Sequence, residues 1–249
     1  MTRTELIKMA ESGNVDAVLE LVKLCVDEQD WNNAIDWADK AAATGNVNGM
    51  YKAANLHSMR MHSILGGGMP FWGLLLEDSK AAQENAAVLI GACRNGQIDL
   101  DDDTYSGLLT VLRDAIYCEA VVAYQSDSND YARGVQLLSS IETPREQALC
   151  GLCHFELSQH DNAMRVLNSV YNDTTYARAK KVPVEEANYA TAMFALSVMT
   201  RMNTGNLDRA IMILNRGIEG ITDEDMKAPL RKELAKYQKK VFGGWKFIG

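Results

Sequence analysis

The chain has 249 residues, of which 47% are hydrophobic and 23% are charged, a composition typical of a folded globular protein. Only four residues are proline, and Ala, Leu, Met, Glu and Lys are frequent, which favours helices over sheets. The net charge of −8 argues against a nucleic-acid partner, because binding to phosphates requires clustered Lys and Arg.

The sequence also indicates a compartment. Residues 1–13 lack the apolar core of a secretory signal. The longest apolar stretch, residues 64–76, is interrupted by glycines and a proline, and it is shorter than the roughly 18 to 20 residues that a membrane-spanning helix needs. The five cysteines are an odd number scattered over helical faces, which suits a reducing environment. We therefore predict a cytoplasmic protein that does not enter a membrane.

Four helices separated by short breaks are predicted at the N-terminal end. Asn14 is placed to cap the second helix with its side chain. Gly45 ends the third, because glycine tolerates the left-handed conformation that often follows a helix. The predicted ranges are 4–12, 14–27, 31–43 and 47–65.

The middle of the chain is less regular. Residues 66–70 read Gly-Gly-Gly-Met-Pro and predict a break, after which a short apolar segment follows. Helix is expected to resume at Asp78 or Ser79 and to end near Arg94. The acidic residues 101–103 then cap a long helix that reaches Gln125. We predict an irregular insertion near residues 64–77.

The C-terminal half again predicts helices joined by short loops. Their expected ranges are 131–141, 144–157, 162–171, 184–203, 207–218 and 223–242, with a polar gap at 172–181. Short loops force successive helices to pack antiparallel. The predicted fold is therefore all-α, an alpha-alpha superhelix (solenoid) of antiparallel helical hairpins. It forms a single domain over residues 1–249 that ends in a short aromatic tail, residues 243–249.

A small residue recurs early in alternate helices. The four examples are Ala34, Gly134, Ala163 and Ala210, and an apolar residue follows each. A small side chain there allows two helix backbones to approach closely. Each hairpin then buries only part of its apolar stripe and needs a neighbour to cover the rest.

This pattern resembles the tetratricopeptide repeat, whose second helix carries a small residue where it lies closest to the first. Gly151 matches the small residue of the family's first helix, and Gly205-Asn206 matches its inter-helix turn. The N-terminal part is similar to the Sel-one-like subclass, through the segment Ala34-x-x-Trp37-x-x-Lys40-Ala41-Ala42-x-x-Gly45-Asn46. The spacing is irregular, since Gly134 and Ala163 are 29 residues apart but Ala163 and Ala210 are 47 apart, and residues 57–114 fit no repeat well.

One motif has the form of a haem attachment site. Cys150-Gly151-Leu152-Cys153-His154 is literally C-x-x-C-H. It falls inside a predicted helix, and haem attachment also needs export, for which no signal is visible. The favoured interpretation is two small core thiols one turn apart beside a half-buried histidine.

Other candidate sites lack essential ligands. The four histidines, His57, His62, His154 and His160, show no zinc-ligand spacing, and His57 and His62 do not share a helical face well. Residues 99–103 lack the ligand ladder of a calcium loop, and residues 66–68 lack the Lys-Ser/Thr of a phosphate loop. We predict no metal, no cofactor and no catalytic residues, and hence a protein that is not an enzyme.

The resemblance to helical-repeat proteins implies a protein-interaction scaffold or adaptor that binds a partner peptide or helix. Two alternatives remain: a regulatory sensor of a small ligand or signalling peptide and, more remotely, an unrecognised enzyme. The aromatic tail either folds back onto the last hairpin or docks on another subunit, so a homodimer is possible. The predicted partner-binding residues are Asp16, Lys23, Trp72, Arg145, Phe155 and Trp245.

Overall fold

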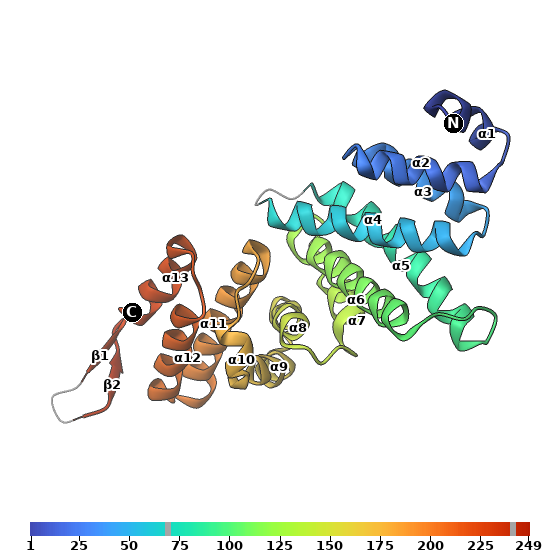
Figure 1. Cartoon of the computed structure of the whole chain (residues 1–249). Coiled ribbons are helices and arrows are strands. Elements are labelled where there is room, and N and C mark those ends of the chain that lie inside the picture. The colour runs from blue at the N-terminus through green and yellow to red at the C-terminus, as the bar shows by residue number, and fades with distance from the viewer. Residues whose placement is uncertain (68–70, 240–242) are drawn as a thin grey trace. The chain divides into compact units, whose positions relative to one another are not determined.

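The computed structural model describes residues 1–67, 71–239 and 243–249, and in these ranges the chain folds into thirteen α-helices and one two-stranded hairpin (Figure 1). It divides into two compact units, Met1–Glu119 and Ala120–Gly249, and the boundary falls within a helix. The predicted all-α class is confirmed, whereas the prediction of one continuous domain stays a prediction.

The N-terminal unit is built from α1 to α5 and the first part of α6. Each of the helices α1 to α5 packs against the next along the chain. The elements are α1 (Arg3–Glu11), α2 (Val15–Asp27), α3 (Trp31–Ala43), α4 (Val47–Gly66), α5 (Trp72–Arg94) and α6 (Asp102–Gln125).

The C-terminal unit continues with the end of α6 and seven further helices. A large apolar cluster of this unit joins α8, α9, α11 and α12 and extends to α13 and the hairpin. The elements are α7 (Tyr131–Leu138), α8 (Pro144–Glu156), α9 (His160–Asn172), α10 (Thr174–Arg178), α11 (Pro183–Thr204), α12 (Leu207–Glu219), α13 (Glu224–Leu234), β1 (Tyr237–Lys239) and β2 (Trp245–Phe247).

Local capping explains why most helix bounds were predictable. The side chain of Asn14 accepts a hydrogen bond from the Ala17 backbone N–H at the start of α2, at 3.0 Å. Gly45 follows α3 with a φ of +79°, in the left-handed region that favours glycine. Both signals lie within a few residues of the helix end that they define.

Small residues lie where successive helices approach one another. Ala34, Ala163 and Ala210 have no exposed surface. A Cβ atom on Gly49 of α4 would lie 2.6 Å from the Ala41 carbonyl carbon of α3. That atom is backbone and cannot rotate away, so the chain requires glycine there. These contacts confirm sequential, antiparallel helix packing consistent with a helical repeat.

The prediction for residues 71–79 was wrong about where α5 begins. The helix starts at Trp72 rather than at Asp78 or Ser79. Leu75 is fully buried, so the short apolar segment forms the first turns of α5 and contributes to the core. Residues 68–70, within the predicted insertion, lie outside the described residues.

Three other bounds also differ from prediction. The helix expected over 131–141 ends at Leu138, and the polar gap at 172–181 contains the short helix α10. The helix expected over 223–242 ends at Leu234, and β1 and β2 follow as an antiparallel pair with Tyr237 opposite Phe247. The rings of these two residues lie 5.3 Å apart, and Tyr237 belongs to the buried core, so packing at this end favours strand over helix. Residues 240–242 lie outside the described residues.

Within the described ranges, none of the helices combines the length and the apolar character needed to cross a bilayer.

Candidate functional site

A cavity of the N-terminal unit has a volume of about 530 Å³. It lies between the turn that joins α2 to α3, the first turns of α3 and the second half of α4. Its lining combines apolar side chains with polar ones. The residues are Gln29, Asp30, Trp31, Asn32, Ile35, Leu56, Met59, Arg60 and Ser63.

The apolar wall has a buried floor and an exposed rim. Ile35 and Leu56 are 3% and 6% exposed and belong to the apolar core between α2, α3 and α4. Trp31 and Met59 lie at the same cavity but are 42% and 53% exposed. The large apolar side chains of Trp31 and Met59 are therefore partly exposed to solvent, next to the buried side chains of Ile35 and Leu56.

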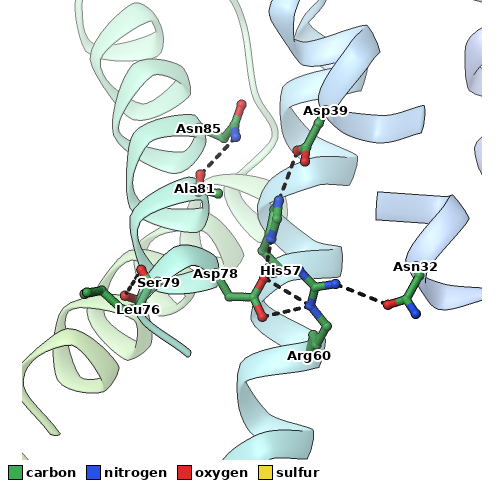
Figure 2. A network of polar contacts seen from close by, with 9 residues as sticks. All are labelled: Asn32, Asp39, His57, Arg60, Leu76, Asp78, Ser79, Ala81 and Asn85. Atoms are coloured by element: carbon green, nitrogen blue, oxygen red, sulfur yellow. Dashed lines mark hydrogen bonds and ion pairs between the residues drawn. The ribbon is translucent and has the colours of Figure 1, made fainter. Parts of the chain in front are cut away.

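Arg60 forms the polar wall and is held in place by a buried carboxylate (Figure 2). Its Nε donates to Asp78 Oδ2 at 2.8 Å, and its second guanidinium nitrogen donates to Asp78 Oδ1 at 2.6 Å. Its remaining nitrogen donates to Asn32 Oδ1 at 3.3 Å. Such two-point contacts fix both the position and the plane of a guanidinium.

His57 extends this network across three helices. Its Nδ1 lies 2.6 Å from Asp78 Oδ1 of α5, and its Nε2 lies 3.0 Å from Asp39 Oδ1 of α3. Both ring nitrogens therefore face carboxylate oxygens, an arrangement that requires the imidazolium form. We call His57, Arg60, Asp39 and Asp78 the α3–α5 network.

The electrostatics of the network agree with its geometry. Burial disfavours the charged form of His57, but the hydrogen bonds to Asp39 and Asp78 outweigh it and raise the pKa of His57 to about 9. Burial likewise opposes ionisation of Asp78, yet the hydrogen bonds from His57 and Arg60 hold its pKa below the usual value. At neutral pH the network contains two cations and two anions.

This arrangement favours a positioning role for the network. Both nitrogens of His57 are already engaged, and its side chain is 6% exposed, so the ring has no free lone pair to accept a proton from a bound molecule. The network instead joins α3, α4 and α5 and fixes Arg60 at the cavity wall.

Three of the predicted partner-binding residues lie in the N-terminal unit, and none of them lines the cavity. Asp16 and Lys23 are exposed on α2. Trp72 is half-buried at the start of α5. Their binding roles stay predictions.

The other three predicted residues lie in the C-terminal unit. Arg145 forms ion pairs with Glu146 and, at 3.5 Å, with Glu185. Phe155 is half-buried on α8, and Trp245 is half-buried in β2, and both pack against the apolar core. The tail thus folds back on its own unit, the first of the two alternatives considered. Any binding role of these residues also stays a prediction.

The cavity residues Trp31, Met59 and Arg60 were missed by sequence reasoning. Trp31 and Ile35 are spaced i, i+4 and therefore share one face of α3. That spacing is a usable signal, but it does not show that Trp31 stays exposed while Ile35 is buried. The exposure depends on how α4 packs.

The cysteine motif is part of the core. Cys150 and Cys153 are buried in α8 as free thiols, and burial raises their pKa values to about 11 and about 12. Gly134 of α7 lies against Cys153, with 2.5 Å between the place of its missing Cβ and the sulfur. His154 Nδ1 lies 2.6 Å from Gln159 Oε1. These contacts agree with the favoured interpretation of small core thiols.

Among residues 1–67, 71–239 and 243–249, no three His, Cys, Asp or Glu side chains are gathered so that they could hold a metal ion.

Comparison with known proteins gave no relative: no protein-family model matches the sequence, and a search of curated proteins found no match. The fold itself defines the class. The chain is an all-helical protein of sequentially packed helices, consistent with a helical repeat.

Proposed function

We propose that this chain is a protein-interaction scaffold that binds a segment of a partner protein at the cavity of the N-terminal unit. The observation that carries the proposal is the pair Trp31 and Met59, two large apolar side chains exposed at the rim of a cavity with a buried apolar floor. Trp is among the residues that most often dominate binding energy at protein interfaces.

The architecture supports the same proposal. Stacked helical hairpins present extended surfaces on which peptides or helices of partners bind. Buried Ala34 and the close approach of Gly49 to Ala41 are what a tetratricopeptide-like superhelix would require. That finer assignment of the fold is part of the proposal.

The rigidity of the site is a further argument. The α3–α5 network fixes Arg60, and the core fixes Ile35 and Leu56, so little ordering is needed when a partner binds. Preformed sites lose less conformational entropy on association than flexible ones.

The proposal is tested by selecting a random peptide library on the wild-type chain and measuring Kd of the enriched peptides by fluorescence anisotropy. We expect Trp31→Ala to weaken binding about tenfold, or about 1.4 kcal/mol, the size of a moderate interface hot spot. Met212→Ala, which truncates a similarly exposed methionine of the C-terminal unit, serves as the control and is expected to leave Kd unchanged. Peptides that bind Trp31→Ala as tightly as the wild type, or no enriched peptide at all, would contradict the proposal.

A second candidate is a sensor of a small ligand. The volume of about 530 Å³ lies within the range of roughly 300–1,000 Å³ typical of small-molecule sites. A fragment library screened by ligand-observed NMR against wild type and Trp31→Ala distinguishes the two functions. Fragments that require Trp31, in the absence of any peptide that requires it, would favour the sensor.

A further inference from the structure

The two units differ strongly in charge. Residues 1–119 contain nine Lys and Arg and eighteen Asp and Glu, a net charge of −9, whereas residues 120–249 contain sixteen and fifteen, a net charge of +1. The acidic character of the chain is therefore confined to the unit that contains the cavity. A surface of one charge sign attracts partners of the opposite sign and raises their rate of association.

Acidic side chains lie at the cavity and continue along α3. Asp30 lines the cavity and its side chain is 35% exposed. Asp36 is exposed one helical turn beyond Asn32. Its negative charge is close enough to Arg60 to contribute to the raised pKa of that guanidinium. Asp39 is one turn beyond Ile35, and its side chain is 46% exposed. By the rise of an α-helix, Asp36 and Asp39 lie roughly 6 and 10 Å along the axis from Asn32.

Two of the cations near the cavity, Arg60 and Arg3, are already engaged by carboxylates, and a third, Lys40, lies over the ring of Trp37. Arg60 is bound by Asp78, which is fully buried. Arg3 lies 2.6 Å from Glu28 and 3.7 Å from Asp30. Asp36, by contrast, takes part in none of the ion pairs found among the described residues. The local field beside the cavity is therefore negative.

From the cavity and this charge distribution we propose that the occupant is a basic segment of a partner protein, with one large apolar side chain in the cavity and a Lys or Arg nearby that faces Asp36 and Asp39. This inference rests on the proposed function and adds the chemistry of the partner. The apolar side chain contacts Trp31 and Met59, and the basic one adds charge complementarity along α3.

The test uses two peptide libraries that share a central Leu, Phe or Trp. In one, the flanking positions are drawn from Lys, Arg and neutral residues, and in the other from Asp, Glu and neutral residues. Enriched peptides are measured by fluorescence anisotropy at about 0.15 M salt, where charges more than about 8 Å apart are largely screened. The variants are Trp31→Ala, Asp36→Asn and, as a matched loss of one exposed charge from the α5–α6 loop, Asp99→Asn.

We expect the basic library alone to give peptides whose binding requires Trp31. We expect Asp36→Asn to weaken them about threefold, the effect of one exposed ion pair, and Asp99→Asn to leave Kd unchanged. Two results would overturn the inference while leaving the proposed function intact: Trp31-dependent peptides that are acidic or neutral, or equal effects of Asp36→Asn and Asp99→Asn. A failure of both libraries to give any Trp31-dependent peptide would overturn the proposed function itself, and this inference with it.

Discussion

The two compact units of this chain differ in how the polar contacts between their helices are arranged. In residues 1–119, four ionised side chains of the α3–α5 network link three successive helices beside a core in which alanine is frequent. In residues 120–249, a large apolar cluster, in which alanine is also frequent, joins α8 to α13, and the buried carboxylates of Glu146 and Glu233 each form an ion pair with an arginine. An apolar core tolerates gradual repacking, whereas a buried ion network fixes side-chain geometry and fails when one member is removed.

The largest change in unfolding free energy is expected when Asp78 is removed. Asp78→Ala leaves His57 and Arg60 without their shared carboxylate, and the loss of one partner of a buried ion pair costs about 3–5 kcal/mol. Urea unfolding followed by Trp fluorescence measures this, because three of the four tryptophans lie in residues 1–119. Asp99→Ala, an exposed carboxylate, is the control and is expected to change the unfolding free energy by less than about 0.5 kcal/mol. Similar values for the two variants would show that the network contributes little.

Raising the pH weakens the same network reversibly. The folded pKa of His57 is about 9 and its ordinary value is 6.5, so its contribution to stability is complete below pH 6.5 and is lost as the pH rises through 9. The expected loss in unfolding free energy between pH 7 and pH 9 is about 2 kcal/mol, from the linkage of the two pKa values.

A substitution shows whether His57 causes this pH dependence. His57→Gln is expected to be less stable at pH 7 and to lack most of this pH dependence. Cys25, Cys150 and Cys153 retain their protons to higher pH than ordinary thiols, so their contribution falls mainly above this window. An unchanged pH dependence in His57→Gln would contradict the assignment.

The smallest effect is expected at the end of the second unit. Phe247 packs 5.3 Å from the ring of Tyr237, and the guanidinium carbon of Arg201 lies 3.8 Å from its centroid. Phe247→Ala should therefore destabilise the hairpin by about 1–2 kcal/mol. Hydrogen exchange is expected to accelerate in β1 and β2 but not in α2 to α4. Ile248→Ala, an exposed neighbour, is the control, and equal acceleration in both variants would show that these ring contacts do not hold the hairpin.

The sequence predicted the features that depend on neighbouring residues. The bounds of α3 were predicted as observed, because Asp30 and Gly45 mark its ends. The hairpin was not predicted, because the Lys-rich segment after α13 favours a helix locally. The strand is favoured by packing, in which Phe247 contacts both Tyr237 and the distant Arg201. The effect of packing overrides propensity at that end of the chain.

The candidate site was missed for the same reason. His57 was compared with His62 on its own helix, whereas its partner Asp78 lies 21 residues away on the next helix. Asp78 falls close to the predicted start of a helix, where a carboxylate is usually a cap. Only the packing of α4 against α5 brings the two residues together.

The central claim, that the cavity of the first unit binds a partner segment, is tested most directly by NMR of the protein with ¹³C-labelled methionine methyl groups. Met59 at the cavity and Met212 on α12 are 53% and 58% exposed, so they form a matched pair in the two units. On titration with a selected basic peptide, we predict that the Met59 signal shifts with the same Kd as the anisotropy signal while Met212 does not move. A shift of Met212 with a stationary Met59 would contradict the account.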